Sequence, residues 1–198
     1  TSSKAAARDK LNKAALDFMP TNGAAAFDDV GGGAILRQDL GSTAADMDAQ
    51  LAALYARAPA AKEALDGFCR RVVTDAGLDL DQEMIFVAGQ AVPLKGWARV
   101  AEKAKNEYDG DAARLVDLAR GSIVCGDEAA LVAVLKRVVE DFSDEGGDVC
   151  VVRLKNRFRK PLFNGYRDVL INLRLWLPDG TFMVVEFQVH LVQILEFK

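Results

Sequence analysis

The chain has 198 residues, of which 51% are hydrophobic and 27% are charged, and its formal net charge is −4. This composition is typical of a globular protein and argues against a wholly disordered chain. The net acidity argues against nucleic-acid binding by overall charge, and no apolar stretch approaches the ~20 residues that span a bilayer.

Helices are predicted for the first part of the chain. Apolar residues at helical spacing predict an amphipathic helix over residues 1–18, and the glycines of 19–42 indicate a loop. Thr43 and Asp46 form a capping-box-like helix start. We expect the apolar stripe that follows to form two helices, separated at Pro59.

Strands predominate in the second part of the chain. Five segments carry the short apolar runs or alternating patterns that are typical of strands: 84–92, 120–125, 149–157, 167–177 and 181–190. Helices are predicted over 96–106 and 127–142, and a final one begins near Leu191. The turn at 178–180 joins the last two strands as an antiparallel hairpin. This order of elements predicts a mixed α/β or α+β fold.

The three cysteines, Cys69, Cys125 and Cys150, are odd in number and widely spaced. Their spacing supports neither a disulfide framework nor a zinc site. Cys69 and Cys125 lie in apolar surroundings, so we expect buried free thiols in a reducing compartment, the cytoplasm.

Residues 153–174 concentrate positive charge in an acidic chain. They carry seven basic residues and one acid, a local charge of +6 that leaves −10 for the rest of the chain. Arg153, Lys155 and Arg157 alternate along a predicted strand, so their side chains point to one face. Such a run can be a solvated surface, but a concentrated positive patch also suits an anionic ligand.

Polar residues also alternate along the last predicted strand. Glu186, Gln188 and His190 share one face, and the apolar residues between them suit the core. A carboxylate beside a positive patch can hold a metal ion that bridges phosphates. Asp117, which precedes the strand at 120–125, can supply a second carboxylate.

Three segments together resemble motifs of the synthetase domain of the RelA/SpoT alarmone synthetases: KNRF at 155–158, NGYR at 164–167 and EFQV at 186–189. Lys95 and Lys103 match the spacing of two lysines in that family, and DLARGS at 117–122 resembles the family's strand entry. The resemblance covers about residues 84–198, which we take as the main domain after an N-terminal helical extension of residues 1–83.

The resemblance implies a nucleotidyltransferase-like fold, in which helices flank a mixed β-sheet. It also implies a reaction, the transfer of pyrophosphate from ATP to the ribose 3′-hydroxyl of GDP or GTP, with Mg²⁺ as cofactor. Catalysis of this kind depends on positioning and on electrostatic stabilisation, with little covalent work for the protein.

The resemblance also implies roles for single residues. Asp117 and Glu186 would hold Mg²⁺, and Glu186 would help to remove the 3′-hydroxyl proton. Tyr166 would stack on the acceptor base. The other expected substrate-binding residues are Lys95, Lys103, Lys155, Arg157, Arg153, Gln188, Arg120 and His190.

The chain departs from the family pattern at five positions: Pro93, Ser122, Asn156, Leu170 and His190. Three of these replace family arginines, at Pro93, Ser122 and His190, although Arg120 lies near Ser122. The changes affect the expected adenine site and acceptor specificity more than the expected metal site.

Three functions therefore remain open. The first is a pyrophosphokinase that uses ATP and a guanine or adenine nucleotide. The second is pyrophosphorylation of a tRNA 3′ end, with which a local basic patch is compatible. The third is a nucleotide-binding or interaction module without catalysis, which the departures from the family pattern favour.

Overall fold

The computed structural model describes residues 35–41, 46–81, 84–86, 94–142, 147–159, 161–163 and 165–195. Its strands are β1 (Met84–Phe86), β2 (Arg120–Cys125), β3 (Val149–Asn156), β4 (Val169–Trp176) and β5 (Phe182–Leu191). Its helices are α3 (Met47–Asp75), α4 (Trp97–Tyr108), the 3₁₀ helix η1 (Ala112–Arg114), α5 (Glu128–Phe142) and α6 (Val192–Leu195). The helix predicted over 1–18 and most of the loop after it lie outside the described residues.

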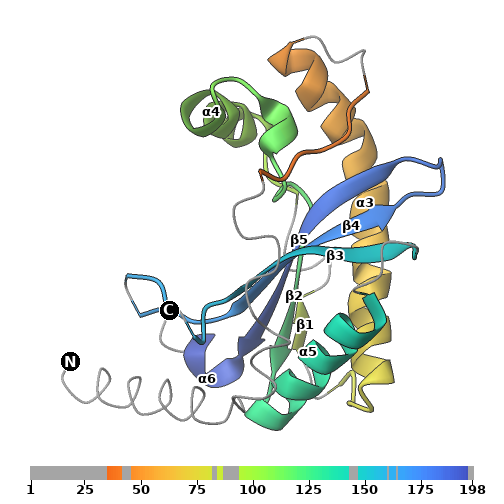
Figure 1. Cartoon of the computed structure of the whole chain (residues 1–198), viewed down its shortest axis with the longest axis vertical. Helices are drawn as coiled ribbons and strands as arrows, with labels where there is room; N and C mark the ends of the chain where they lie inside the picture. Colours follow the sequence, from red (N-terminus) through yellow and green to blue (C-terminus); the bar gives the residue numbers. More distant parts are fainter. Residues whose placement is uncertain are drawn as a thin grey trace.

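The five strands form one mixed sheet in the order β1-β2-β5-β4-β3 (Figure 1). The central pair, β2 and β5, is parallel, and the other pairs are antiparallel. This arrangement confirms the predicted mixed sheet with flanking helices. It also confirms strands within all five predicted segments, although only Met84–Phe86 of the first segment is described as a strand.

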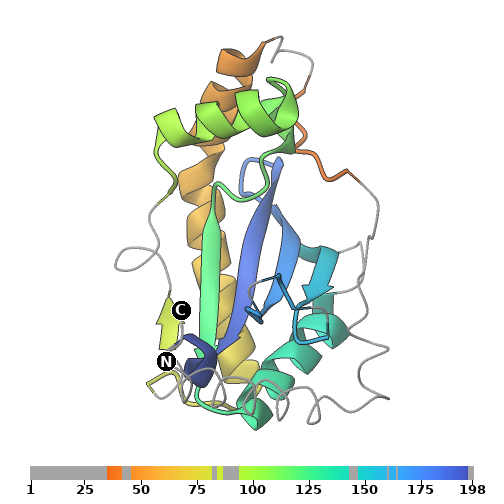
Figure 2. The same cartoon turned by 90° about the vertical axis from the view of Figure 1, so that its left-hand side faces the viewer.

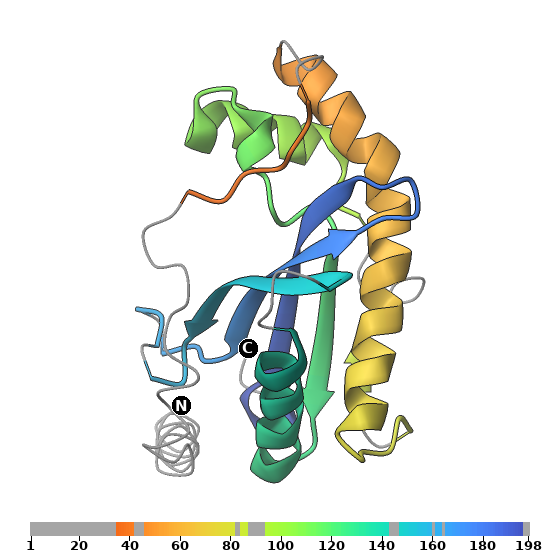
Figure 3. The same ribbon diagram turned by 45° about the vertical axis from the view of Figure 1, so that its right-hand side comes forward.

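Helices α3 and α5 cover the same face of the sheet and contact each other (Figure 3). The rings of Phe68 on α3 and Phe187 on β5 lie 5.5 Å apart in an edge-to-face contact. Val185 and Val189, which alternate with Glu186 and Gln188, are fully buried on this side. In the view of the opposite face, α3 passes behind the strands and α4 crosses near their upper ends (Figure 2).

The prediction of two helices separated at Pro59 is wrong, because α3 is one helix of 29 residues with Pro59 inside it. Pro59 is exposed, so the hydrogen bond that it removes lies on the solvent side. The buried stripe continues in phase on both sides of the proline: Leu51, Leu54, Ala58, Ala61, Leu65, Phe68 and Val72. Packing of this continuous stripe outweighs the local cost of the proline.

Helix α3 shares one hydrophobic core with the sheet. The closest approach is at Gly121 on β2, where an added Cβ would lie 3.1 Å from Leu65 and 3.3 Å from Sγ of Cys69. The boundary between residues 83 and 84 stays a prediction, but α3 itself packs directly on the strands of the expected main domain.

A bulge interrupts β3 between Val151 and Arg153. Val151 pairs with Leu173, which faces the helices, whereas Arg153 pairs with Asn172 on the other face. The extra residue therefore changes the phase of the strand, so that odd-numbered residues face the core before it and the open face after it.

All three cysteines are buried, as was expected for Cys69 and Cys125. Burial raises the pKa of the Cys69 thiol to about 12, which makes it a poor nucleophile at neutral pH. Among the described helices, none has the length and apolar character needed to cross a membrane.

Candidate functional site

The open face of the sheet carries a row of polar side chains across four strands. Four consecutive Cα partners form this row: Arg120 on β2, Glu186 on β5, Asn172 on β4 and Arg153 on β3. Directly paired residues point to the same side of a sheet, so these side chains share one face. The adjacent row on the same face consists of Ser122 on β2, Gln188 on β5, Leu170 on β4 and Lys155 on β3. Each of these residues is two positions from the member of the first row on its strand.

Asp117 precedes β2 at the edge of this face, and its carboxylate binds two lysines. Its Oδ2 accepts a hydrogen bond from Nζ of Lys95 and another, of 2.8 Å, from Nζ of Lys103. Burial raises the pKa of Asp117, but the hydrogen bonds from the two lysines outweigh this effect and leave the pKa below its usual value. Asp117 is therefore ionised at neutral pH.

Glu186 supplies the second carboxylate of the site, from the centre of β5. Burial raises its pKa, and the neighbouring carboxylate of Asp117 raises it further. The cations of Lys95, Arg120 and Lys103 oppose this rise without cancelling it. The backbone N–H of Glu186 donates a hydrogen bond of 3.1 Å to the carbonyl oxygen of Ala119, two residues after Asp117, so the two carboxylates belong to one cluster of charges.

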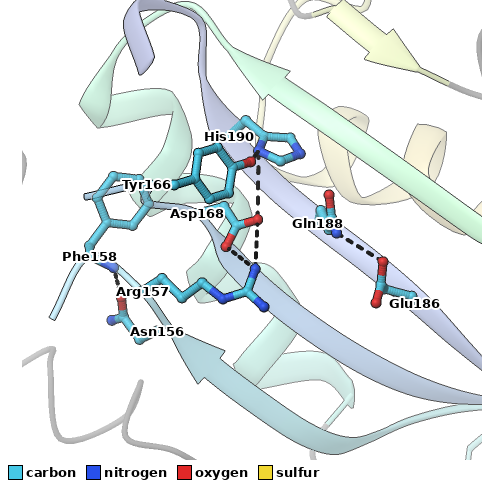
Figure 4. Close-up of polar contacts among 8 residues, drawn as sticks. All are labelled: Asn156, Arg157, Phe158, Tyr166, Asp168, Glu186, Gln188 and His190. Atoms are coloured by element: carbon cyan, nitrogen blue, oxygen red, sulfur yellow. Dashed lines mark hydrogen bonds and ion pairs between the residues drawn. The ribbon is translucent and has the colours of Figure 1, made fainter. Parts of the chain in front are cut away.

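The two carboxylates suit a divalent cation whose other ligands are phosphate groups of a substrate. Oδ1 of Asp117 is buried and has no hydrogen-bond partner among the described residues, so it is a free ligand atom. Oε1 of Glu186 accepts a hydrogen bond of 2.9 Å from Nε2 of Gln188 (Figure 4). Mg²⁺ is commonly bound by one or two carboxylates together with substrate phosphates. The described residues contain no group of three or more acidic, His or Cys side chains that could hold a metal alone.

A pocket of about 330 Å³ lies along α4, next to Asp117. Its lining residues are Lys95, Arg99, Glu102, Lys103, Asn106 and Glu107. Lys95 and Lys103 both line the pocket and bind Asp117, so the pocket adjoins the carboxylate pair. Arg99 and Lys103 are four residues apart and therefore lie on one face of α4, so the pocket lining holds three cations together with two carboxylates, Glu102 and Glu107.

The basic side chain of Arg153 has a polar partner on the open face. Its Nε donates a hydrogen bond of 2.9 Å to Oδ1 of Asn172, which is fully buried. Burial lowers the pKa of Arg153, and the Glu186 carboxylate opposes this change, so the two charges are neighbours. Nε of Arg120 is buried without a hydrogen-bond partner among the described residues. Part of the basic patch is thus directed at the site and is not a solvated surface.

A second polar cluster, formed by Arg157, Asp168, His190 and Tyr166, lies on the same face (Figure 4). Nη1 of Arg157 donates to both carboxylate oxygens of Asp168, at 2.9 and 3.2 Å. The Tyr166 hydroxyl lies 3.0 Å from Nδ1 of His190, which lies 4.0 Å from Asp168. Burial raises the pKa of Tyr166, and the Asp168 carboxylate raises it further, so the hydroxyl is protonated at neutral pH.

The structure therefore groups the predicted site residues in two clusters. The first contains Asp117, Glu186, Lys95, Lys103, Arg120, Gln188 and Arg153, and the second contains Arg157, Tyr166 and His190. Lys155 is exposed in the row that contains Gln188. Pro93, which departs from the family pattern, and Asn164, which belongs to the NGYR motif, lie outside the described residues.

Two residues of the site, Asp168 and Asn172, were not singled out from the sequence. Both are buried polar side chains that bind an arginine. The available signal for Asp168 was its position as the only acid of the basic segment. Asn172 is a polar residue within the apolar run of β4, and only the sheet register reveals its arginine partner.

Three solved structures are similar to this chain. One is the complex between the Type VI effector Tas1 and its immunity protein, with TM-score 0.50, 24% identity and coverage of 71% of this chain and 61% of that chain. Another is a GTP pyrophosphokinase family protein from Streptococcus pneumoniae, with TM-score 0.50, 16% identity and coverage of 67% and 64%. The small alarmone synthetase 2 from Bacillus subtilis gives TM-score 0.49, 16% identity and 66% coverage of both chains.

The two structures with a TM-score of 0.50 establish the fold. The predicted resemblance to RelA/SpoT-like synthetases is confirmed at that level, and the low identity agrees with a divergent sequence. The chain spans less than two thirds of the length of these structures. No protein-family model and no curated protein sequence matches the chain.

Proposed function

We propose that this protein is a pyrophosphokinase that transfers pyrophosphate from ATP to the 3′-hydroxyl of a second nucleotide. The observation that carries the proposal is the pair of coupled carboxylates, Asp117 and Glu186, among lysines and arginines on the open face of the sheet. A site of this charge pattern suits a reaction that brings two highly anionic substrates together. The fold, shared with a GTP pyrophosphokinase family protein, supports the same reaction class.

The donor nucleotide would bind along α4. Lys95, Arg99 and Lys103 line the pocket there and offer three cations to the phosphate chain of ATP. Asp117 and Glu186 would hold Mg²⁺, which, when bound, neutralises phosphate charge during the transfer. Cationic side chains and a metal ion directed at transferring phosphates are the usual source of catalysis in such reactions.

Glu186 is also suited to accept the proton of the attacking hydroxyl. A new bond forms between the acceptor 3′-oxygen and the β-phosphorus of ATP, while the bond from that phosphorus to the oxygen of the α-phosphate breaks and AMP leaves. The hydroxyl proton must pass to a base. The raised pKa of Glu186 makes it a stronger base than an exposed glutamate, which favours this role.

The acceptor would bind toward the second cluster. The ring of Tyr166 would stack on its base, and Arg157 and Lys155 would face its phosphates. We propose a guanine nucleotide, GDP or GTP, as acceptor, with an adenine nucleotide or a tRNA 3′ end as alternatives that the test below separates. A reaction between soluble nucleotides suits the cytoplasm.

The test is incubation of the full chain and Mg²⁺ with ATP labelled in the β-phosphate. GDP, GTP, ADP and a tRNA are supplied as acceptors in separate reactions, and the products are separated by chromatography. We expect release of AMP and transfer of the label to a mononucleotide. Absence of AMP release with every acceptor would contradict the proposal.

A binding module without catalysis is the second candidate, because Ser122 and His190 stand where the family has arginines. Calorimetric titration with ATP separates the two candidates. Binding of ATP without transfer in the labelled reaction would favour the binding module.

A further inference from the structure

Lys95 and Lys103 have two structural roles that compete with each other. Both line the pocket along α4, and both donate to the same oxygen, Oδ2 of Asp117. A lysine nitrogen carries one unit of charge, so a phosphate group that binds it competes with this carboxylate for the same counter-ion.

The charges around Asp117 oppose the binding of a metal ion alone. Around the two carboxylates, Asp117 and Glu186, lie four cations, Lys95, Lys103, Arg120 and Arg153, which outnumber the carboxylates even when Glu107, beside Lys103, is added. A divalent cation would enter against this charge, and unit charges a few ångströms apart interact strongly at a partly buried site. A phosphate chain reverses the balance, because it adds several negative charges beside the same lysines.

We propose that Lys95 and Lys103 are exchangeable counter-ions of Asp117. They neutralise its carboxylate in the free protein and move to the phosphates when a nucleotide binds, so the divalent metal ion binds together with the nucleotide and not before it. The inference rests on the proposed function for the identity of the phosphate ligand, and it adds the order of binding.

The local structure allows the lysine side chains to move while their backbone stays in place. The hydroxyl of Tyr55 on α3 donates a hydrogen bond to the backbone carbonyl of Lys95, and the rings of Tyr55 and Trp97 lie 5.1 Å apart. These contacts hold the start of α4 against α3. Exchange then needs only rotation of long side chains, which is fast compared with movement of a helix.

The test measures binding of Mn²⁺, as a spectroscopic and calorimetric substitute for Mg²⁺, to the full chain without nucleotide. We expect Lys103→Met to bind Mn²⁺ at least about tenfold more tightly than the wild type, because one repelling charge beside Asp117 is removed. Lys95→Met should show the same gain. Lys105→Met is the matched control, because Lys105 is exposed on the same helix, and it should leave Mn²⁺ binding unchanged.

Two further measurements complete the test. In the presence of a non-cleavable ATP analogue, the wild type should bind Mn²⁺ at least about tenfold more tightly. The analogue itself should bind more weakly to Lys103→Met than to the wild type. Asp117→Asn in the Lys103→Met background should remove the gain in metal affinity. Thermal unfolding of each variant checks that the Mn²⁺ affinities being compared are those of folded proteins.

Equal Mn²⁺ affinity in wild type, Lys103→Met and Lys95→Met would overturn the inference. Wild-type affinity that is the same with and without the ATP analogue would also overturn it. The titrations with metal alone need no turnover, so they give an answer even if the labelled-ATP reaction contradicts the proposed activity. The two proposals therefore fail in distinguishable ways.

Discussion

The hydroxyl group of Tyr166 and Nδ1 of His190 lie 3.0 Å apart, although 24 residues separate them in the chain. Tyr166 follows the loop after β3, and His190 lies near the end of β5, so the contact ties the loop to the sheet. Asp168 and Arg157 extend the contact into a four-residue cluster. The orientation of the Tyr166 ring is therefore set by polar groups on two different elements.

Two substitutions at Tyr166 separate its ring from its hydroxyl group. Tyr166→Ala should weaken acceptor binding by about 1–3 kcal/mol, the contribution of a base stacked on an aromatic ring, and should raise KM for the acceptor. Tyr166→Phe keeps the ring and loses the contacts of the hydroxyl, among them those with His190 and Asp168, so its effect should be about 0.5–1.5 kcal/mol. Steady-state kinetics with varied acceptor measures both, and an equal effect of the two variants would contradict a stacking role.

Glu186→Gln should abolish transfer while the protein keeps its stability. The amide has the shape of the carboxylate but has no negative charge to hold the metal ion and cannot accept the proton, so we expect a loss of about 10³-fold or more in kcat. The raised pKa of Glu186 means that its ionised form is disfavoured in the folded protein. The Tm of Glu186→Gln near pH 7 should therefore equal or exceed that of the wild type. Full activity of this variant would mean that the catalytic carboxylate is another residue.

The pH dependence of transfer provides a separate prediction. Since the reaction needs ionised Glu186, kcat/KM should rise with pH through a pKa above 4.5, the ordinary value of a glutamate. Measurement across the acid range, with circular dichroism at each pH to follow folding, checks the position of this limb. A limb at or below the ordinary value would mean that Glu186 is not the group that titrates.

Asp117→Asn should behave differently from Glu186→Gln, because Asp117 has two lysine partners. Loss of the charge leaves Lys95 and Lys103 without their counter-ion, and we expect a cost of about 1–3 kcal/mol in the free energy of unfolding. The lowered pKa of Asp117 means that its stabilisation is complete above pH 3.8, its ordinary value, and is lost as the pH falls below it. Denaturant unfolding of both proteins at several pH values should show a difference that shrinks in acid.

Gly121→Val tests the packing of α3 on β2. The added side chain would contact buried atoms of Leu65 and Cys69, so we expect a loss of about 1–3 kcal/mol in the free energy of unfolding. Gly67→Ala on α3 is the control, because its Cβ would meet no atom within 4 Å and alanine is the better helix former. A neutral effect of Gly121→Val would contradict the close approach of α3.

Local patterns in the sequence were sufficient to predict most of the fold. Alternation predicted the faces of β5, because strand side chains alternate regardless of the neighbouring strands. The continuity of α3 through Pro59 was not predicted, because a proline was taken as a break although the apolar stripe keeps its phase across it.

The sequence motifs pointed to the residues of the candidate site, but the contacts between these residues were not predicted. The motif resemblance identified Asp117, Lys95 and Lys103, yet it implied phosphates as the partners of both lysines. Their hydrogen bonds to Asp117 join residues 22 and 14 positions apart, and only the folded chain places α4 beside the start of β2. The cluster around Asp168 could not be predicted either, because it depends on the pairing of β3 with β4.

The bulge in β3 makes the direction of the basic side chains depend on the pairing of the strand and not on residue type alone. The extra residue places Val149 and Val151 toward the helices but Arg153 and Lys155, which are also odd-numbered, on the open face. With regular pairing and the same number of residues, Arg153 would lie opposite Ile171 and Lys155 opposite Val169, so both would point toward the helices. The bulge thus fixes which charges the sheet presents on its open face, and deletion of Val152 would remove the bulge without turning these charges away.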